Sequence, residues 1–222
     1  MSRHRLLCKA LLFDLDGVLA DTTALVEATW AEWAESRGLD RGLATQVHGR
    51  PTAEIISDVT PELDPAHEAR EIESWQERQV LTVTAVDGAL ELVGSLPPGN
   101  WAVVTSGTRV QAAARLAAID LAAPAVVITS EDVAAGKPDP EPYLTAAARL
   151  GIGPEDCVVF EDAPAGLASG RAAGMRTIGV ATTVGRELLE GADHIVDSLR
   201  QVRAEPSGDR IAVEVHPPPS GR

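Results

Sequence analysis

Aromatic side chains and long hydrophobic runs are both scarce in this sequence. Aromatic residues make up only 3% of the 222 residues, so the hydrophobic core has to be built from Ala, Val, Leu and Ile. A surface on which nucleic-acid bases could stack is then hard to form, which disfavours single-stranded nucleic-acid binding. No apolar run approaches the roughly 18 residues of a membrane span. We therefore expect a soluble globular protein.

Cysteine is scarce as well, because Cys8 and Cys157 are the only two in the chain. Both lie in apolar runs typical of strands, so we expect reduced thiols in the core rather than a disulfide framework. The basic N-terminus resembles a signal peptide for a few residues, but Lys9 splits its apolar run and Asp14 ends it. Together these features predict a cytoplasmic protein.

Positive charge is in short supply. The formal net charge is −14, so the surface repels nucleic acid and anionic membranes. It would also repel a phosphate group, so a phosphate site here needs local positive charge. A metal ion, a lysine and helix N-termini are the usual sources of such charge. We expect no nucleic-acid and no membrane partner.

The first third of the chain changes from a strand pattern to helical patterns. Leu6–Phe13 is a short apolar run that predicts a buried parallel strand leading into a polar loop. From Thr23 to Gly38 apolar residues recur at helical spacing, and 51–59 and 65–80 also look helical, each with Pro near its start. We interpret the stretch 21–85 as an all-helical insertion after the first strand.

After Asp87-Gly88, predicted strands alternate with predicted helices. This alternation implies right-handed βαβ units and a parallel sheet covered on both faces. The fold class is therefore α/β, with a Rossmann-like doubly wound core formed by 1–20 and 86–203 and a helical domain formed by 21–85. For 204–222 we expect a flexible tail or an added edge strand. The strands expected in this region are Trp101–Thr105, Ala125–Ile128, Cys157–Phe160, Thr177–Val180 and His194–Val196.

Polar residues follow four of these strands, and in open α/β sheets ligands bind at the carboxyl ends of the strands. Their shared feature is a carboxylate, hydroxyl, glycine or ammonium group just after an apolar strand: Asp14 and Asp16, then Thr105, Ser106 and Gly107, then Lys137, then Glu161 and Asp162. Each signal alone is weak. Their order, each after its own strand, predicts one assembled site.

The chemistry of these groups points to phosphoryl transfer. Clustered carboxylates repel one another unless a cation binds, and oxygen-only ligands suit Mg²⁺. Thr105 or Ser106, with backbone N–H groups at the next helix N-terminus, can hold phosphoryl oxygens. Lys137 can neutralise both the phosphate and Asp14. Asp14 is then a candidate nucleophile that forms an aspartyl-phosphate, and Asp16 a candidate general acid and base.

At this point the sequence resembles the haloacid dehalogenase superfamily, over about residues 7–202. The resemblance rests on Phe-Asp-Leu-Asp-Gly-Val-Leu at 13–19, Val-Val-Thr-Ser-Gly-Thr at 103–108, Gly-Lys-Pro-Asp-Pro at 136–140 and Val-Phe-Glu-Asp-Ala-Pro-Ala-Gly at 159–166. In combination these motifs are highly specific.

The resemblance implies a role for each motif residue. Asp14 would be the nucleophile and a metal ligand, and Asp16 the acid/base that also binds Mg²⁺ through its backbone carbonyl. Thr105 and Lys137 would hold the phosphate. Glu161 and Asp162 would complete the metal site. We add Ser106 and Gly107 as phosphate-binding candidates.

The helical insertion resembles the small cap of this superfamily, which acts as a lid over the substrate. His48-Gly49-Arg50 resembles the cap loop that reaches into the active site of the sugar-phosphate phosphatases, so Arg50 is a candidate substrate-binding residue. Because such a lid has to move, we expect a monomer. The motif wording most resembles phosphatases of small polyol and hexose phosphates.

Particular residues argue against rival activities. The alternative is a β-phosphoglucomutase-like isomerase, but that group usually carries a His shortly after the first motif, and residues 21–27 contain none. A dehalogenase proper requires neither Asp16 nor a metal. A phosphonate hydrolase resembles this layout but uses a cap lysine, and no Lys occurs between Ala10 and Gly136.

A non-catalytic scaffold is disfavoured because every motif position is filled. We therefore expect a magnesium-dependent hydrolase of small sugar or polyol phosphate monoesters.

Overall fold

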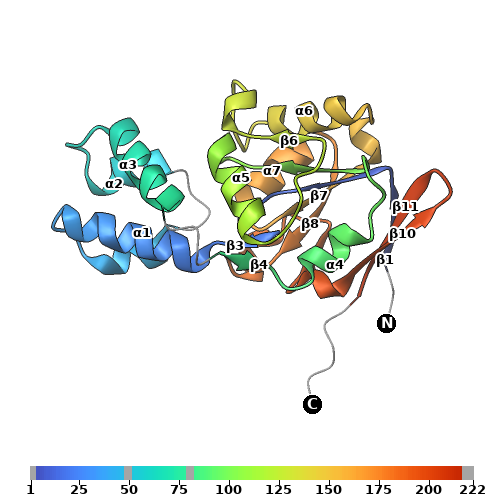
Figure 1. Ribbon diagram of the computed structural model, residues 1–222, viewed down its shortest axis with the longest axis horizontal. Helices are drawn as coiled ribbons and strands as arrows, with labels where there is room; N and C mark the ends of the chain where they lie inside the picture. Colours follow the sequence, from blue (N-terminus) through green and yellow to red (C-terminus); the bar gives the residue numbers. More distant parts are fainter. Residues whose placement is uncertain (1–3, 48–51, 79–82, 217–222) are drawn as a thin grey trace, which may run out of the picture.

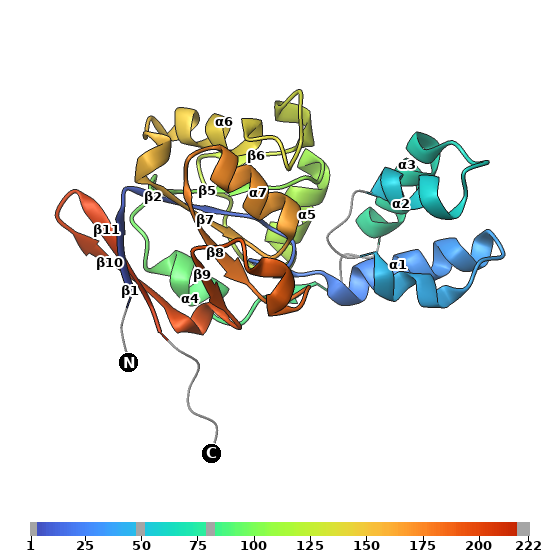
Figure 2. The same cartoon turned by 180° about the vertical axis from the view of Figure 1, so that it is seen from behind.

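The structure is a computed structural model that describes residues 4–47, 52–78 and 83–216. Its centre is a six-stranded parallel sheet in the order β6-β5-β2-β7-β8-β9, with the strands labelled across Figures 1 and 2. The strands are β2 (Ala10–Phe13), β5 (Trp101–Val104), β6 (Val127–Ile128), β7 (Cys157–Glu161), β8 (Arg176–Val180) and β9 (His194–Val196). This confirms the predicted α/β class. Because β2 lies between β5 and β7, its carboxyl end is flanked by the ends of both neighbours.

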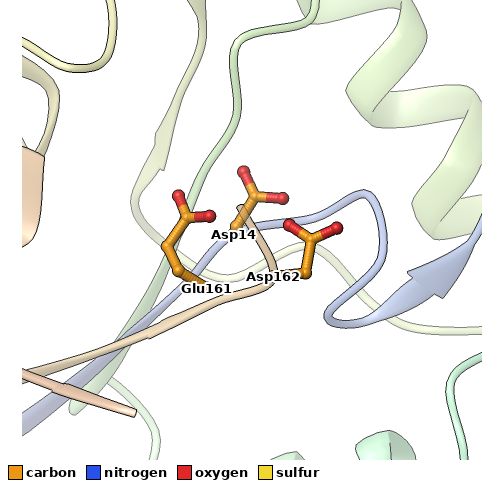
Figure 3. Close-up of side chains that lie close together, drawn as sticks. All are labelled: Asp14, Glu161 and Asp162. Carbon is orange, nitrogen blue, oxygen red and sulfur yellow. The ribbon is translucent and has the colours of Figure 1, made fainter. Parts of the chain in front are cut away.

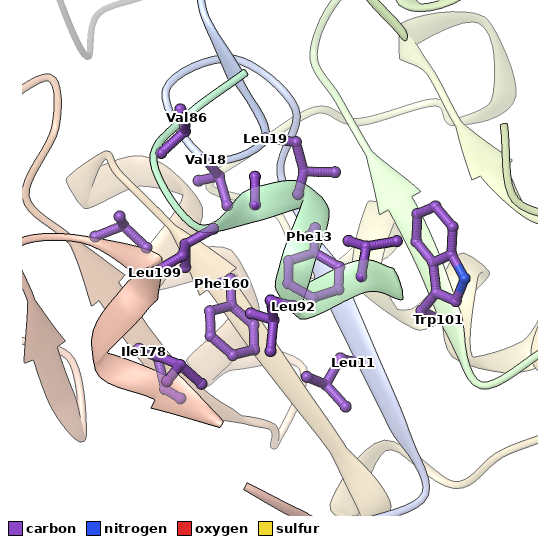
Figure 4. Close-up of a cluster of buried hydrophobic side chains, with 14 of the residues drawn as sticks. Leu11, Phe13, Val18, Leu19, Val86, Leu92, Trp101, Phe160, Ile178 and Leu199 are labelled. Atoms are coloured by element: carbon purple, nitrogen blue, oxygen red, sulfur yellow. The ribbon is translucent and has the colours of Figure 1, made fainter. Parts of the chain in front are cut away.

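Helices cover both faces of the sheet because its strands are apolar on both sides. Leu11 and Phe13 of β2 point to one face, where they pack with residues of α4 (Ala89–Gly94) and α5 (Arg109–Ala118) (Figure 4). Ala10 and Leu12 point to the other face, toward α6 (Glu141–Leu150). On that face α7 (Pro164–Ala172) lies close enough that Gly170 approaches Val159. The alternation within one strand thus builds two core layers.

The single strand predicted over Leu6–Phe13 is wrong, because the chain forms two strands there. The first, β1 (His4–Cys8), pairs antiparallel with β11 (Arg210–Val215), and β2 then enters the parallel sheet. Lys9 makes the break: its N–H donates to the Asp156 carbonyl at 2.7 Å and its carbonyl accepts from Asn100 Nδ2 at 2.8 Å. These bonds turn the backbone away from the first sheet.

The C-terminal region forms ordered strands. Residues 202–207 (β10, Val202–Ser207) pair with β11, which lies in the middle of the antiparallel sheet β1-β11-β10. Of the two possibilities left open for this region, a strand is therefore observed over Arg210–Val215, although it is central rather than at an edge. The strand expected over Ala125–Ile128 is shorter than predicted, since β6 has two residues. Arg186–Leu189 forms a short 3₁₀ helix (η5) between β8 and β9.

The helical insertion lies between β3 (Ala20–Asp21) and β4 (Thr84–Ala85), which pair antiparallel. Its elements are α1 (Thr23–Ser36), η1 (Arg41–Gln46), α2 (Thr52–Val59) and α3 (Pro65–Arg78). We call α1 to α3 the helical lobe. Figures 1 and 2 show it at one end of the molecule, with the β1-β11-β10 sheet at the other.

The helical lobe has a core of its own. Trp30 and Trp33 of α1 pack edge to face, with ring centroids 5.3 Å apart, and they share one cluster with Ile55 of α2 and Ile72 of α3. Glu68 of α3 links that helix to α1, because it accepts a hydrogen bond from Trp33 Nε1 at 2.7 Å and forms an ion pair with Arg37. Within the described ranges, no helix has the length and apolar character needed to cross a bilayer.

Candidate active site

Three neighbouring strands bring the predicted site residues to one edge of the sheet. Asp14 directly follows β2, Thr105 follows β5, and Glu161 ends β7 with Asp162 just beyond it. The backbone N–H of Asp14 donates to the carbonyl of Phe160 at 3.0 Å, which holds the ends of β2 and β7 in register. Figure 3 shows the carboxylates of Asp14, Glu161 and Asp162 close together at this edge.

Three of these carboxylates form a buried cluster. One oxygen from each of Asp14, Glu161 and Asp162 lies within 4.8 Å of the others, and the three residues are only 7%, 1% and 6% exposed. Lys137 is the cation that contacts this cluster, from the loop before α6. Its Nζ lies 2.5 Å from Asp14 Oδ1 and 2.6 Å from Glu161 Oε1, and it donates to the Val104 carbonyl at 3.0 Å.

Burial and neighbouring charges together shift the pKa values of the residues in this cluster. The pKa of Asp14 is raised to about 7, chiefly because burial disfavours the charged form; Lys137 opposes the shift and Glu161 adds to it. Burial, followed by the charges of Asp14 and Glu161, raises the pKa of Asp162 well above its usual range. Burial alone would lower the pKa of Lys137, but Asp14 and Glu161 raise it, so this ammonium stays charged.

Two further hydroxyl groups contact the cluster and were missed by the sequence reasoning. Tyr143 of α6 donates to Glu161 Oε1 at 2.7 Å, and its ring lies 5.3 Å from Lys137 Nζ. The Thr183 hydroxyl donates to Asp162 Oδ2. Tyr143 is the only tyrosine of the chain and lies on the buried face of a helix, which could have drawn attention to it. Thr183 gave no comparable signal.

Two glycines let the backbone approach these carboxylates. A Cβ at Gly17 would lie 2.0 Å from Asp162 Oδ2, and Gly17 has a positive φ of 78°. A Cβ at Gly166 of α7 would lie 1.9 Å from the carboxyl carbon of Glu161. Both positions therefore exclude any side chain while Glu161 and Asp162 keep their places.

Asp16 lies at the same edge but is not part of the three-carboxylate cluster. Its Oδ2 accepts from Arg115 Nη1 of α5 at 2.7 Å. Its Oδ1 is buried and has no hydrogen-bond partner among the described residues. Arg115 is a third residue that the sequence reasoning missed, because nothing in the sequence distinguishes it from an ordinary helix-surface arginine.

The residues after β5 form a tight turn into α5. The Gly107 N–H donates to Thr105 Oγ1 at 3.0 Å, and Thr108 caps α5 in a reciprocal pair with Gln111. A cavity of about 120 Å³ lies beside this turn, and its lining includes Thr105, Ser106, Ser130 and Lys137. A larger cavity of about 460 Å³ lies between α4 and β10, and none of the predicted site residues lines it.

One predicted residue cannot be placed. Arg50, with its neighbour His48, lies outside the described residues. Arg109, which directly follows the second motif, is more than half exposed and pairs with Asp132 at 2.8 Å, away from the carboxylate cluster.

Several known proteins are similar to this chain in sequence and fold. Residues 11–180 match the family model described as haloacid dehalogenase-like hydrolase. Hexitol phosphatase A of Escherichia coli is 38% identical, over 92% of this chain and 98% of its own. Glycerol-1-phosphate phosphohydrolase 2 of Saccharomyces cerevisiae is 35% identical, over 87% and 84%. The crystal structure of a putative β-phosphoglucomutase from Thermotoga maritima matches with a TM-score of 0.66 at 29% identity, over 85% of this chain and 94% of that one.

Proposed function

The chain belongs to the haloacid dehalogenase-like hydrolases, and we propose that within this family it is a magnesium-dependent phosphatase of small sugar or polyol phosphates. It is a phosphoric monoester hydrolase, as its phosphatase relatives are. The observation that carries the proposal is the buried set of Asp14, Glu161, Asp162 and Lys137 at the carboxyl ends of β2 and β7. The names of these two relatives point to hexitol and glycerol phosphates as the substrate class.

The residues fit a divalent cation. If all three clustered carboxylates are ionised, Lys137 neutralises one charge and two negative charges remain, which a dication would balance. The donor atoms of this cluster are all oxygens, and such hard ligands suit Mg²⁺ rather than a softer metal. Burial is the main cause of the raised pKa values of Asp14 and Asp162, and the charge of Glu161 adds to both shifts. Asp14, Glu161, Asp162 and the Asp16 carbonyl would hold the ion, which would neutralise charge on the phosphate.

The chain's own residues then perform the chemistry. Lys137 fixes Oδ1 of Asp14, which leaves the second carboxylate oxygen for in-line attack on phosphorus. A bond forms between Asp14 and phosphorus as the bond from phosphorus to the substrate oxygen breaks. Asp16 donates its proton to that leaving oxygen, and the alcohol departs. Asp16 then takes a proton from water, which hydrolyses the aspartyl-phosphate and restores Asp14.

The phosphate is held by the turn after β5 and by Lys137. Thr105 and Ser106 line the same cavity as Lys137, and the backbone there leads into the N-terminus of α5, whose partial positive charge favours an anion. Gly107 continues this turn, and a Cβ there would lie only 2.9 Å from Gln111 Oε1 and 3.1 Å from Arg115 Nη1. Lys137 contacts Asp14 and would also contact the phosphoryl oxygens as their charge develops.

The helical lobe, within residues 21–85, is the proposed lid. It packs around its own core and joins the rest through the paired β3 and β4, so it can move as a unit. Arg50, predicted from the sequence to bind substrate, belongs to this region and remains a candidate for sugar or polyol recognition. Choice among hexose, glycerol and other polyol phosphates would rest on this lid.

Phosphate release from a panel of phosphate esters tests the proposal, with Mg²⁺ and with EDTA. We expect release that requires Mg²⁺ and is fastest with sugar or polyol phosphates. The panel includes β-glucose 1-phosphate with detection of glucose 6-phosphate. Glucose 6-phosphate formed without free phosphate would contradict a phosphatase and favour the mutase alternative, against which the absence of His in 21–27 argues.

The Asp14→Asn variant tests the nucleophile. Asparagine keeps the size of the side chain but removes the nucleophilic oxygen, so turnover should be abolished while the thermal unfolding curve still shows a folded protein. Turnover of the variant well above background would contradict the assignment of Asp14.

A further inference from the structure

A buried arginine contacts the proposed acid/base and has no role in the mechanism described above. Arg115 lies in the last turn of α5, one helical turn after Gln111 and on the same buried face. Its side chain is 7% exposed, whereas that of Asp16 is 30% exposed. Burying a guanidinium is costly unless its N–H groups find acceptors.

One guanidinium nitrogen fixes the carboxylate of Asp16. Arg115 Nη1 donates to Asp16 Oδ2 at 2.7 Å, a short charge-assisted bond. The other oxygen, Oδ1, is buried and has no partner among the described residues. A carboxylate held through one oxygen cannot rotate freely, so its second oxygen is kept in one direction. That oxygen is the one free to give a proton to a leaving group or to take one from water.

The second terminal nitrogen of the guanidinium contacts the helical lobe. Arg115 Nη2 donates to Gln76 Oε1 of α3 at 3.2 Å. Arg115 belongs to the α/β core and Gln76 to the lobe that we propose as the lid, so one planar group touches both. A lysine would have to reach both acceptors from a single nitrogen, whereas the rigid guanidinium reaches each with a separate one.

We propose that Arg115 is a positioning residue for the acid/base step: it orients the Asp16 carboxylate and ties that orientation to the helical lobe through Gln76. This inference rests on the proposed phosphatase function and assigns to that site a residue outside its four motifs. When the lobe moves, Gln76 moves with it, and the restraint on Arg115 and hence on Asp16 changes.

The test compares two esters that differ in how much they need the acid. An alkyl phosphate releases a strongly basic alkoxide that must be protonated, whereas p-nitrophenyl phosphate releases a stable phenolate that needs no proton. Both form the same aspartyl-phosphate. Because kcat/KM reports on the steps up to that intermediate, the ratio of the two values measures acid catalysis alone. A merely structural arginine would affect both esters equally.

Three variants are compared with the wild type. Arg115→Met keeps the length of the side chain and removes both bonds. We expect kcat/KM for the best alkyl phosphate to fall about 100-fold, within the range for loss of a general acid, and that for p-nitrophenyl phosphate to fall less than about 5-fold. Arg115→Lys keeps a cation near Asp16 and should recover part of the alkyl activity. Arg149→Met is the matched control, since Arg149 pairs with Asp132 and does not touch Asp16; it should leave both values unchanged.

Gln76→Ala tests the link to the lobe and does not disturb the core. We expect the same selective loss for the alkyl ester, about tenfold or less, because the restraint on Arg115 is weakened rather than removed. If the Arg115→Met variant fails to fold, the Gln76→Ala variant still tests whether Arg115 positions Asp16.

The outcomes separate the inference from the proposed function. Wild-type activity on both esters is measured first, and its absence would contradict the phosphatase itself. In an active enzyme, equal losses for the two esters, or no loss for either, would overturn the role of Arg115. An Arg115 effect without any Gln76 effect would overturn the link to the helical lobe.

Discussion

Lys137 is a buried cation that offsets the negative charge of the buried carboxylates around it. A carboxylate taken out of water tends to bind a proton instead of keeping its charge, and the raised pKa of Asp14 follows from that tendency. Lys137 opposes it from 2.5 Å, while it also contacts Glu161. The ammonium can do this because the two carboxylates keep its own pKa high despite burial. Asp14 is thereby favoured in the ionised form that a nucleophile requires.

Replacing Lys137 by Met should lower kcat/KM about 100- to 1,000-fold, the usual cost of removing one preorganised charge from a transition state. The only other lysine, Lys9, provides the matched control. It pairs with Asp156 at 2.8 Å far from the cluster, so Lys9→Met should keep full activity. Steady-state kinetics at saturating Mg²⁺ measure both. A Lys137→Met enzyme within a few-fold of the wild type would contradict the role given to this residue.

Tyr143 should tune the affinity for the metal rather than the chemistry. Its hydroxyl donates to Glu161 Oε1, and partners of metal ligands typically contribute 10- to 100-fold to affinity. Tyr143→Phe should therefore weaken Mg²⁺ binding about tenfold or more, while kcat at saturating Mg²⁺ stays close to the wild-type value. Activity titrated against Mg²⁺ gives both quantities. An unchanged half-saturating Mg²⁺ concentration would rule out this role.

At the scale of elements, the turn after β2 determines how closely β2 and β7 can place their carboxylates. Gly17 takes a φ of 78°, which L-residues with a side chain adopt at a cost of about 1–2 kcal/mol. Its carbonyl accepts from the Thr182 hydroxyl, so the turn is also fastened to the segment after β8. Asp162 occupies the space where a Cβ would lie. The turn therefore needs glycine for two separate reasons.

Gly17→Ala should abolish most metal-dependent activity, because the new methyl group displaces Asp162. Gly99→Ala isolates the free-energy cost of placing an L-residue at a positive φ. Gly99 has a similar φ of 86°, and nothing lies within 4 Å of its Cβ position. We expect Gly99→Ala to lose about 1–2 kcal/mol of unfolding free energy and no activity. Urea unfolding and phosphate release measure the two effects. Equal activity of the two variants would show that Asp162 does not need this approach.

At the scale of the whole molecule, the buried acids make stability depend on pH and metal together. An unfolded Asp has a pKa of about 3.9, whereas that of Asp14 is about 7 in the folded protein. Between about pH 4 and pH 7 the unfolded chain therefore loses a proton that the folded protein keeps. The stability contributed by Asp14 is present below this window and is lost as the pH rises through it.

In EDTA, the Asp14→Asn variant should gain stability relative to the wild type as the pH rises from about 4 to 7, because asparagine has no proton to lose. Saturating Mg²⁺ should stabilise the wild type at neutral pH and have much less effect on the variant. Urea unfolding at several pH values measures the difference in unfolding free energy between the wild type and the variant. Asp209→Asn, at an exposed position, is the control and should track the wild type. A difference that does not change with pH would contradict the raised pKa of Asp14.

The sheet and the convergence of the motifs could be predicted from the sequence, because both follow from local patterns. Each predicted site residue other than Arg50 directly follows an apolar strand or lies in the loop before a helix, and parallel strands end at one edge of a sheet. Asp14, Lys137, Glu161 and Asp162 could therefore be grouped without coordinates. The helical insertion was visible for the same reason, as a change of period from two to 3.6 residues.

Only the tertiary structure decided the contacts made between helix faces and across loops. Arg115 lies 99 residues from Asp16, and Tyr143 lies 18 from Glu161, so no spacing rule joins them. The break at Lys9 likewise depends on Asp156 and Asn100, which reach it from other parts of the chain. The physical reason is that burial satisfies polar groups through space. A local pattern shows which residues enter the core, whereas the packing of distant elements determines which partner each polar group finds.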